Sequence, residues 1–168
     1  TWLGIARSKS TFRFAALTNF RDPAREKSTA TSRGALVTGF LQGNTTALDY
    51  LTEVDTISSA YNGFNLLVCD GDTLACYNNI ERRTERLAPG IHGLSNHVLN
   101  TPWPKVTTAT AALTPTVAPA RQAWRRAGDP ATDRLGAYLG RKFLEFAVGD
   151  VAVGLDVGQV SVAFRESC

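Results

Sequence analysis

The chain has 168 residues, of which 43% are hydrophobic, and a formal net charge of +3. We expect residues 1–168 to form a single domain, and the charge is too small and too dispersed to require a nucleic-acid partner. No apolar run reaches the ~20 residues that a membrane-spanning helix needs, and the first residues lack a signal-peptide pattern. These features predict a cytoplasmic protein with no integral membrane segment.

The cysteine and methionine content limits the kinds of site and of N-terminus that the chain can have. Cys69, Cys76 and Cys168 form no Cys-x-x-Cys pair, which argues against both a zinc site and a disulfide framework. In a tight hairpin over residues 64–79 the first two would not lie opposite each other, so a disulfide between them is not expected. The chain contains no methionine, hence no initiator. We therefore expect that a further segment precedes Thr1.

The first part of the chain predicts a hairpin followed by two helices. Residues 1–9 and 10–20 are apolar, with β-branched and aromatic side chains, and predict two strands joined by a polar turn. Residues 33–43 place apolar side chains on one face of a helix, with Ser32 as the expected N-cap. A second, short helix is expected after Asn44, which can cap it.

The remaining elements alternate strands with helices. Residues 64–79 predict the clearest hairpin, around an Asp-Gly-Asp turn. A helix is expected to begin at Pro104, further helices over 118–129 and 129–140, and two closing strands within 150–167. This order favours an α+β domain, with antiparallel sheets covered by helices, over a doubly wound parallel sheet.

Residues 93–97, Gly-Leu-Ser-Asn-His, differ by one residue from the nucleophile elbow of serine hydrolases. That site needs a distant histidine as its base, but the chain has only His92 and His97, both within three residues of Ser95. Their spacing also suits neither one face of a strand nor one face of a helix for binding a metal. We expect structural roles for both histidines, and neither a metal nor a cofactor.

Two groups of arginines are candidates for holding an anion or an RNA strand. The first lies within residues 82–86, and the second, within 121–126, flanks Trp124. Such spacing is more often the solvated face of a helix or the edge of a sheet. We therefore expect no nucleic-acid partner.

Asparagines are the less usual feature, because four of them adjoin apolar residues at expected strand ends or strand-to-loop junctions: Asn19, Asn62, Asn65 and Asn96. Such side chains either tie down turns through local hydrogen bonds, or aim an amide at negative charge that develops in a reaction. Composition does not separate these alternatives.

Five blocks of this sequence resemble, in order and separation, the NRDE family, also called the transport and Golgi organisation family. They are TWLGIA, FAALTNF, RGALVTGFL, YNGFNLLV and GLSNHVLNTPWPK. The resemblance covers residues 1–105 well. Family members begin with Met-Cys and an Asn-Arg-Asp-Glu motif that this sequence lacks. The resemblance therefore implies a single NRDE-like domain without its first segment.

By fold the family is similar to the N-terminal nucleophile hydrolases, which implies a four-layer αββα sandwich with antiparallel sheets. In the related choloylglycine hydrolases and penicillin V acylases, the α-amino group of the first residue serves as base for its own side chain, so no histidine is needed. The resemblance implies that Asn96 donates to the oxyanion, with Asn19 as a weaker candidate. Thr1 would be the nucleophile only if the mature chain began there, and we expect instead a cysteine upstream of it.

The resemblance leaves two functions open. One is an N-terminal-nucleophile amide hydrolase or acyl transferase acting on a small amide or acyl substrate. The other is a non-catalytic binding or transport protein for haem or acyl-chain ligands, linked to secretory or Golgi organisation. Candidate substrate contacts are Asn62, Asn65 and Trp103, and the expected partner is a small amide, acyl or haem-like ligand.

Overall fold

The computed structural model describes residues 2–7, 12–88, 91–111, 144–148, 151–155 and 160–164. It divides into two compact units. The first unit is Thr1–Ala88 with Asn96–Val98, and the second is Pro89–Ser95 with Leu99–Cys168. Within the ranges described, no helix is both long enough and apolar enough to cross a membrane.

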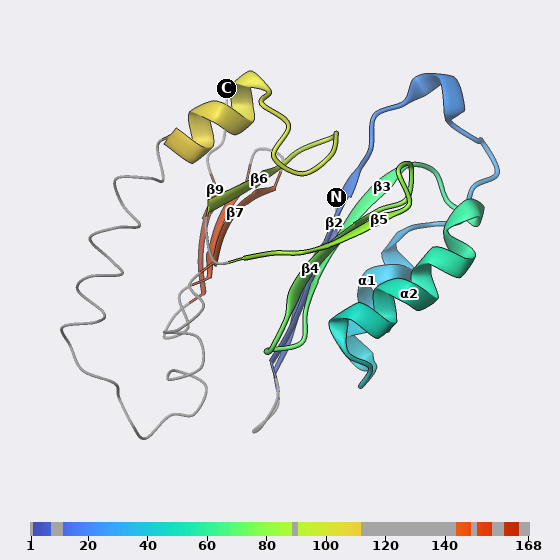
Figure 1. Cartoon of the computed structure of the whole chain (residues 1–168), viewed down its shortest axis with the longest axis horizontal. Helices are drawn as coiled ribbons and strands as arrows, with labels where there is room; N and C mark the ends of the chain where they lie inside the picture. The colour runs from blue at the N-terminus through green and yellow to red at the C-terminus, as the bar shows by residue number, and fades with distance from the viewer. Residues whose placement is uncertain are drawn as a thin grey trace. The chain divides into compact units, whose positions relative to one another are not determined.

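The first unit contains an antiparallel sheet whose strand order follows the sequence (Figure 1). Its strands are β1 (Trp2–Arg7), β2 (Phe12–Asn19), β3 (Phe64–Cys69), β4 (Leu74–Asn78) and β5 (Arg83–Arg86). Both predicted hairpins, β1–β2 and β3–β4, are confirmed. In the second hairpin Asp70 accepts the backbone N–H groups of Asp72 and Thr73, and Gly71 takes the φ of +97° that the turn requires.

The register of β3 and β4 confirms the prediction for the cysteines of this hairpin. Cys69 lies opposite Leu74, and Cys76 lies opposite Leu67. Neither cysteine forms a disulfide, and both are buried. Burial, followed by the nearby charge of Glu85, raises the pKa of Cys76 to about 12, so this thiol is inert at neutral pH.

Two α-helices, α1 (Gly34–Gln42) and α2 (Ala47–Ile57), cover one face of this sheet (Figure 1). Both were predicted, but both N-caps were assigned wrongly. Arg33, not Ser32, is the N-cap of α1, and Thr46, not Asn44, is that of α2. The short 3-10 helices η1 (Pro23–Arg25) and η2 (Ser58–Ala60) complete the unit.

Both faces of the sheet are apolar. On the helix face, Leu17, Leu66 and Val68 pack with Phe40 and Leu51, and all five are at most 2% exposed. Strand side chains alternate between faces, so Phe14, Ala16, Leu67, Cys69 and Cys76 belong to the other face, and they are buried as well. Side chains on both faces of this sheet are therefore buried.

The second unit contains a sheet of order β6-β7-β8-β9. Its strands are β6 (Ile91–Leu94), β7 (Leu144–Val148), β8 (Val151–Leu155) and β9 (Val160–Phe164). The closing pair β8–β9 confirms the two strands predicted at the end of the chain. The expectation of purely antiparallel sheets is wrong here, because β6 and β7 are parallel.

Residues 104–111 are helical, as predicted from Pro104. Strands β6 and β7 were not predicted. The helices expected over 118–129 and 129–140 lie outside the described residues, as does the arginine group around Trp124.

Candidate functional site

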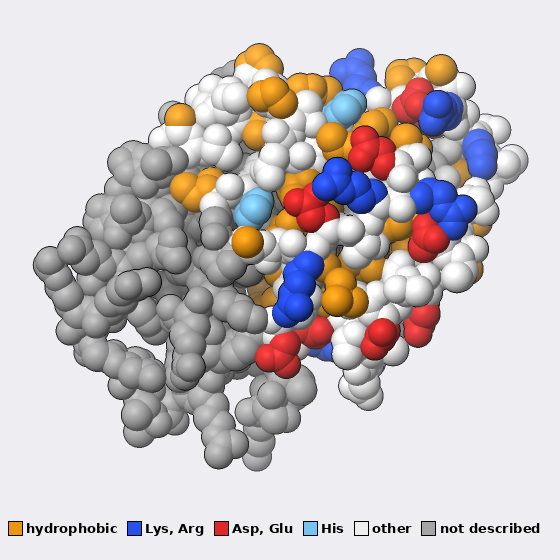
Figure 2. All heavy atoms as spheres, viewed as in Figure 1, with side chains coloured by type: hydrophobic (Ala, Val, Ile, Leu, Met, Phe, Trp, Pro, Cys, Tyr) orange, Lys and Arg blue, Asp and Glu red, His pale blue; other side chains and the backbone are white. Residues whose placement is uncertain are grey.

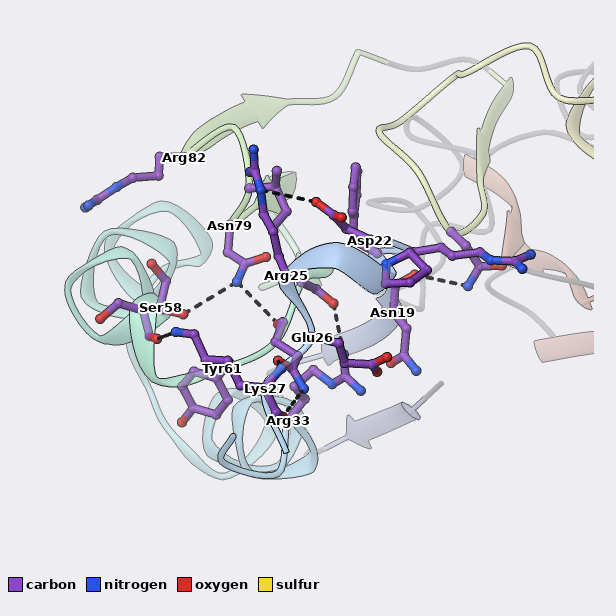
Figure 3. Close-up of a pocket in the computed structure, with 18 residues that line it drawn as sticks. Asn19, Asp22, Arg25, Glu26, Lys27, Arg33, Ser58, Tyr61, Asn79 and Arg82 are labelled. Carbon is purple, nitrogen blue, oxygen red and sulfur yellow. Dashed lines mark hydrogen bonds and ion pairs between the residues drawn. The ribbon is translucent and has the colours of Figure 1, made fainter. Parts of the chain in front are cut away.

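A cavity of about 500 Å³ lies in the first unit (Figure 3). It forms at one end of the sheet, where β2 ends at Asn19, β3 begins at Phe64 and β4 ends at Asn78. The loops that leave these strand ends line it, with residues 19–23, 25–27, 33, 58, 59, 61–63, 79, 80, 82 and 96. Segments far apart in the sequence thus share one site.

Four asparagines line this cavity, and three of them, Asn19, Asn62 and Asn96, were candidates from the sequence. The Asn96 side-chain amide donates to the carbonyl oxygen of Asn19 at 3.0 Å, and the Asn96 carbonyl oxygen accepts the Arg21 N–H at 2.8 Å. These two bonds fix Asn96 against the end of β2. One of its two amide N–H groups is therefore already used within the protein.

Asn62 holds the segment over residues 20–33 in place. Its Oδ1 accepts the backbone N–H of Lys27 at 2.7 Å, and its Nδ2 donates to the Lys27 carbonyl oxygen at 2.9 Å. The N–H of Phe20 donates to Gly63 at 2.9 Å, an approach so close that a Cβ on Gly63 would lie 3.0 Å from the Phe20 Cβ. Asn62 therefore binds backbone, and its first role is to shape the cavity.

Asn65 lies behind the cavity and does not line it. Its side chain is fully buried, donates to Thr18 Oγ1 at 3.2 Å and to the His97 carbonyl oxygen at 2.9 Å, and accepts from Asn78 at 2.7 Å. A buried polar group needs such partners, and here they are supplied. Through His97 this network positions the residues beside Asn96.

The other candidates from the sequence are placed elsewhere. Trp103 belongs to the second unit, where its carbonyl oxygen accepts the N–H groups of Val106 and Thr107 at the start of the helix over 104–111. Thr1 lies outside the described residues. The ring of His97 packs on Phe20 with 4.9 Å between centroids. His92 is in β6 of the second unit, with Asn100 Nδ2 3.3 Å from its Nδ1.

Positive charge dominates the lining of the cavity. Five cationic side chains against two acidic ones give +3, the cations being Arg21, Arg25, Lys27, Arg33 and Arg82, and the acids Asp22 and Glu26. On the face drawn in Figure 2, Lys and Arg side chains lie among those of Asp and Glu. Counted by side chain, the lining of the cavity has an excess of cations.

Two of the five cations are neutralised by ion pairs, Arg25 with Asp22 at 3.4 Å and Arg82 with Asp55 at 2.6 Å. Within the described residues, the side chains of two others, Lys27 and Arg33, donate only to neutral carbonyl oxygens. The Nζ of Lys27 is 3.0 Å from the oxygen of Ser59, and Nη1 of Arg33 is 2.9 Å from that of Gly63. Their charges are therefore not compensated by these bonds.

Arg82 is held at the rim of the cavity with a φ of +51°, uncommon for a residue with a side chain. Asp55 accepts from Nε and Nη2 of Arg82 and from the hydroxyl of Tyr77 at 2.6 Å. These bonds hold the pKa of Asp55 below its usual range. Burial, then the bond to Asp55, raises the pKa of Tyr77 to about 12. In the first arginine group, Arg83 and Arg86 lie exposed on the edge strand β5. This confirms the prediction that such arginines more often lie at the edge of a sheet or on a solvated helix face.

Sequence reasoning missed Asn79, Lys27 and Arg33. Asn79 accepts the Phe64 N–H at 2.7 Å and reaches the carbonyl oxygens of Ser58 and Asn62 at 3.5 and 3.4 Å, so it joins the loops of the cavity (Figure 3). The signal for Lys27 was the charged run RDPAREK over residues 21–27, interpreted only as a polar loop, whereas Arg33 lies outside that run.

The described lining supplies amides, cations and hydroxyls, but no cysteine or histidine. Within the part of the chain that the structure describes, no three His, Cys, Asp or Glu side chains gather into a metal site. These groups can hold and orient a ligand. None of them forms the pair of nucleophile and base that covalent chemistry needs.

The chain is similar in sequence to proteins of one known family. The family described as Transport and Golgi organisation 2 matches residues 1–139. Over 113 residues the chain is 44% identical to Transport and Golgi organization protein 2 homolog of Bos taurus and 43% identical to that of Homo sapiens. Transport and Golgi organization 2 homolog of Mus musculus is 42% identical over the same length. Each match covers 63% of this chain and 39% of the relative, so the matched part spans about two fifths of the relatives' length.

Proposed function

Because the chain belongs to the Transport and Golgi organisation 2 family, we propose that its cavity binds an amphipathic anionic small molecule and that the protein acts as a carrier. The observation that carries this proposal is the lining of the cavity, where Arg21, Lys27 and Arg33 form no ion pair with a described carboxylate and no nucleophile–base pair occurs in the residues described. Small-molecule sites usually combine apolar surface with a few placed polar groups, and this lining has both.

The size and the chemistry of the cavity suit such a ligand. Its volume of about 500 Å³ falls within the ~300–1,000 Å³ usual for small-molecule sites. Phe20, Tyr61 and Ile80 supply apolar surface beside the amides and cations. An acyl chain or a macrocycle with acidic groups, such as haem, combines the two required properties.

The family name supports a role in transport and in the secretory or Golgi system. A carrier for acyl-chain or haem ligands fits that role without requiring a reaction. In this proposal the protein works from the cytoplasm.

A ligand panel of acyl-CoA, haem and bile-salt-like molecules tests the binding function by thermal shift and calorimetry. A true ligand at 100 times its Kd stabilises the fold by ~2.7 kcal/mol. Arg21→Glu, which reverses a charge in the cavity lining, should weaken binding. Arg86→Glu makes the same change on β5 outside the cavity and should not. No shift with any member of the panel at saturation would count against the proposal.

A second candidate, an N-terminal-nucleophile amide hydrolase or acyl transferase, is favoured by one observation: Asn19 and Asn96 share the cavity and Asn96 is fixed. In this mechanism Asn96 donates to the oxyanion and the nucleophile is a cysteine upstream of Thr1. The apolar character of both faces of the sheet supports the αββα sandwich of that class.

Covalent labelling by an electrophilic acyl probe, followed by mass spectrometry, tests the hydrolase. Asn96→Ala should then reduce turnover of any substrate by about 100-fold, because losing one oxyanion donor costs ~3 kcal/mol. Asn100→Ala, which removes an asparagine from the second unit, is the control. A protein that no probe labels is not this enzyme.

A further inference from the structure

Arg33 occupies a position for which an arginine is a poor choice. It is the N-cap of α1, where Ser, Thr, Asp or Asn is preferred because the side chain can accept a backbone N–H. Among the residues described, no side chain makes such a capping bond at α1, and its first turn contains no acid. A cation at the positive end of a helix is also unfavourable. Local stability therefore does not explain this residue.

The position of Arg33 in the tertiary structure supplies another explanation. The residue is half-buried, lines the cavity, and directs Nη1 to the Gly63 carbonyl oxygen at 2.9 Å. A guanidinium has five N–H donors, and in the part of the chain described the Arg33 side chain makes this one hydrogen bond. The remaining donors are available to a ligand.

Lys27 lies on the same side of the cavity (Figure 3). Its backbone is paired with Asn62, the neighbour of Gly63, and its Nζ donates to Ser59 at 3.0 Å. No carboxylate of the described residues lies within ion-pair distance of Lys27 or Arg33. Glu26 and Asp22 also line the cavity, and Asp22 is paired with Arg25.

We infer that Arg33, with Lys27 beside it, is the anchor for the anionic group of the ligand. This inference rests on the proposed binding function and names the residues that determine its specificity. A guanidinium binds planar oxyanions through two parallel N–H···O bonds, which suits a carboxylate or a phosphate. The anion would also compensate the positive charge at the start of α1.

Four probes with the same apolar tail test this inference by calorimetry on the full chain: hexyl phosphate, hexanoate, hexanol and hexyltrimethylammonium. The two anions should bind and the cation should not. The tighter of the two anions identifies the headgroup. Arg33→Ser should weaken binding of that anion at least about tenfold, since a charge-assisted hydrogen bond is lost. Arg33→Lys should retain part of the affinity, and Arg83→Ser on β5 all of it.

Arg33→Ser should fold, because serine is a preferred N-cap. If its circular dichroism differs from that of the wild type, Arg33→Gln, which keeps a donor without the charge, replaces it. Equal affinity of the anions for wild type and folded variant would overturn the inference, and so would equal binding of the cation. In either case a ligand found in the panel would leave the carrier function standing. If no panel ligand and no probe binds the wild type, both are wrong.

Discussion

The N-termini of α1 and α2 differ although both helices pack on the same face of the same sheet. At α2, Thr46 accepts the Asp49 N–H at 3.2 Å, and the N–H of Ala47 donates to Asp70 Oδ2 at 2.7 Å. Asp49 adds a negative charge in the first turn. At α1 the N-cap is Arg33, with neither a capping side chain within the described residues nor an acid in the first turn.

The difference corresponds to the position of the cavity. The start of α2, residues 46–49, does not line it, whereas the start of α1 does through Arg33. A helix end that only has to be stable follows the capping rules. At the start of α1, the proposed ligand binding would explain why an arginine stands where the capping rules favour another residue, because sequences tend to break local rules at functional sites. The following predictions test this contrast.

The largest effect on stability is expected from Asp70→Ala at the start of α2. Asp70 accepts three backbone N–H groups, from Ala47, Asp72 and Thr73, and joins the helix to the β3–β4 turn. Losing this charged acceptor should lower the free energy of unfolding by ~2–3 kcal/mol, measured by urea denaturation. Asp72→Ala removes an exposed charge from the same turn and should cost much less.

The same carboxylate should make stability depend on acid. Burial opposes ionisation of Asp70, but the three N–H groups outweigh it and lower its pKa. Because the unfolded chain has the ordinary value of ~3.9, the stabilisation is present above about pH 4 and is lost as pH falls through the lowered pKa. Asp70→Asn should flatten this part of the stability profile. A variant profile parallel to that of the wild type would contradict the assignment.

A smaller loss is expected from Thr46→Ala, which removes the capping hydroxyl of α2. The cost should be ~1 kcal/mol, the usual value for an N-cap. Thr46→Ser keeps the hydroxyl and should be close to neutral. If alanine were tolerated as well as serine, the cap would not contribute to stability, and the contrast between the two helices would weaken.

The smallest change in stability is expected from Arg33→Ser in the ligand-free protein. A serine N-cap should strengthen α1, while loss of the bond to Gly63 weakens its attachment, so the two should nearly cancel within ~0.5 kcal/mol. Urea denaturation without ligand measures this. A loss as large as that of Asp70→Ala would show that Arg33 is a structural residue.

Local patterns predicted the elements of the first unit well but their ends poorly. The alternation of β2 and the Asp-Gly-Asp turn identified both hairpins, since adjacent strands with tight turns need only nearby residues. The N-caps were misplaced by one and two residues, because Ser32 and Asn44 are suitable caps by type and the packing of each helix decides where it starts. Strand β6 escaped prediction because its partner β7 follows some 50 residues later.

The four candidate asparagines show most clearly what the sequence alone could not predict. Asn19, Asn62 and Asn96 lie at strand ends or junctions as predicted, whereas Asn65 lies inside β3. Residue type could not separate Asn65, buried in a hydrogen-bond network, from Asn62 and Asn96 on the cavity. Their hydrogen-bond partners are 13 to 77 residues away. Only the folded chain brings those partners within reach.

By itself the sequence determined the two helices and two hairpins of the first unit, the closing strand pair and the family, because each depends on residue types at short or fixed separations. Tertiary structure alone decided the site. The cations of the cavity are separated by up to 61 residues, from Arg21 to Arg82, and converge only because three strand ends meet at one edge of the sheet. The net charge of a site depends on which side chains lie close together in space. The order of residues along the chain does not show this before the chain has folded.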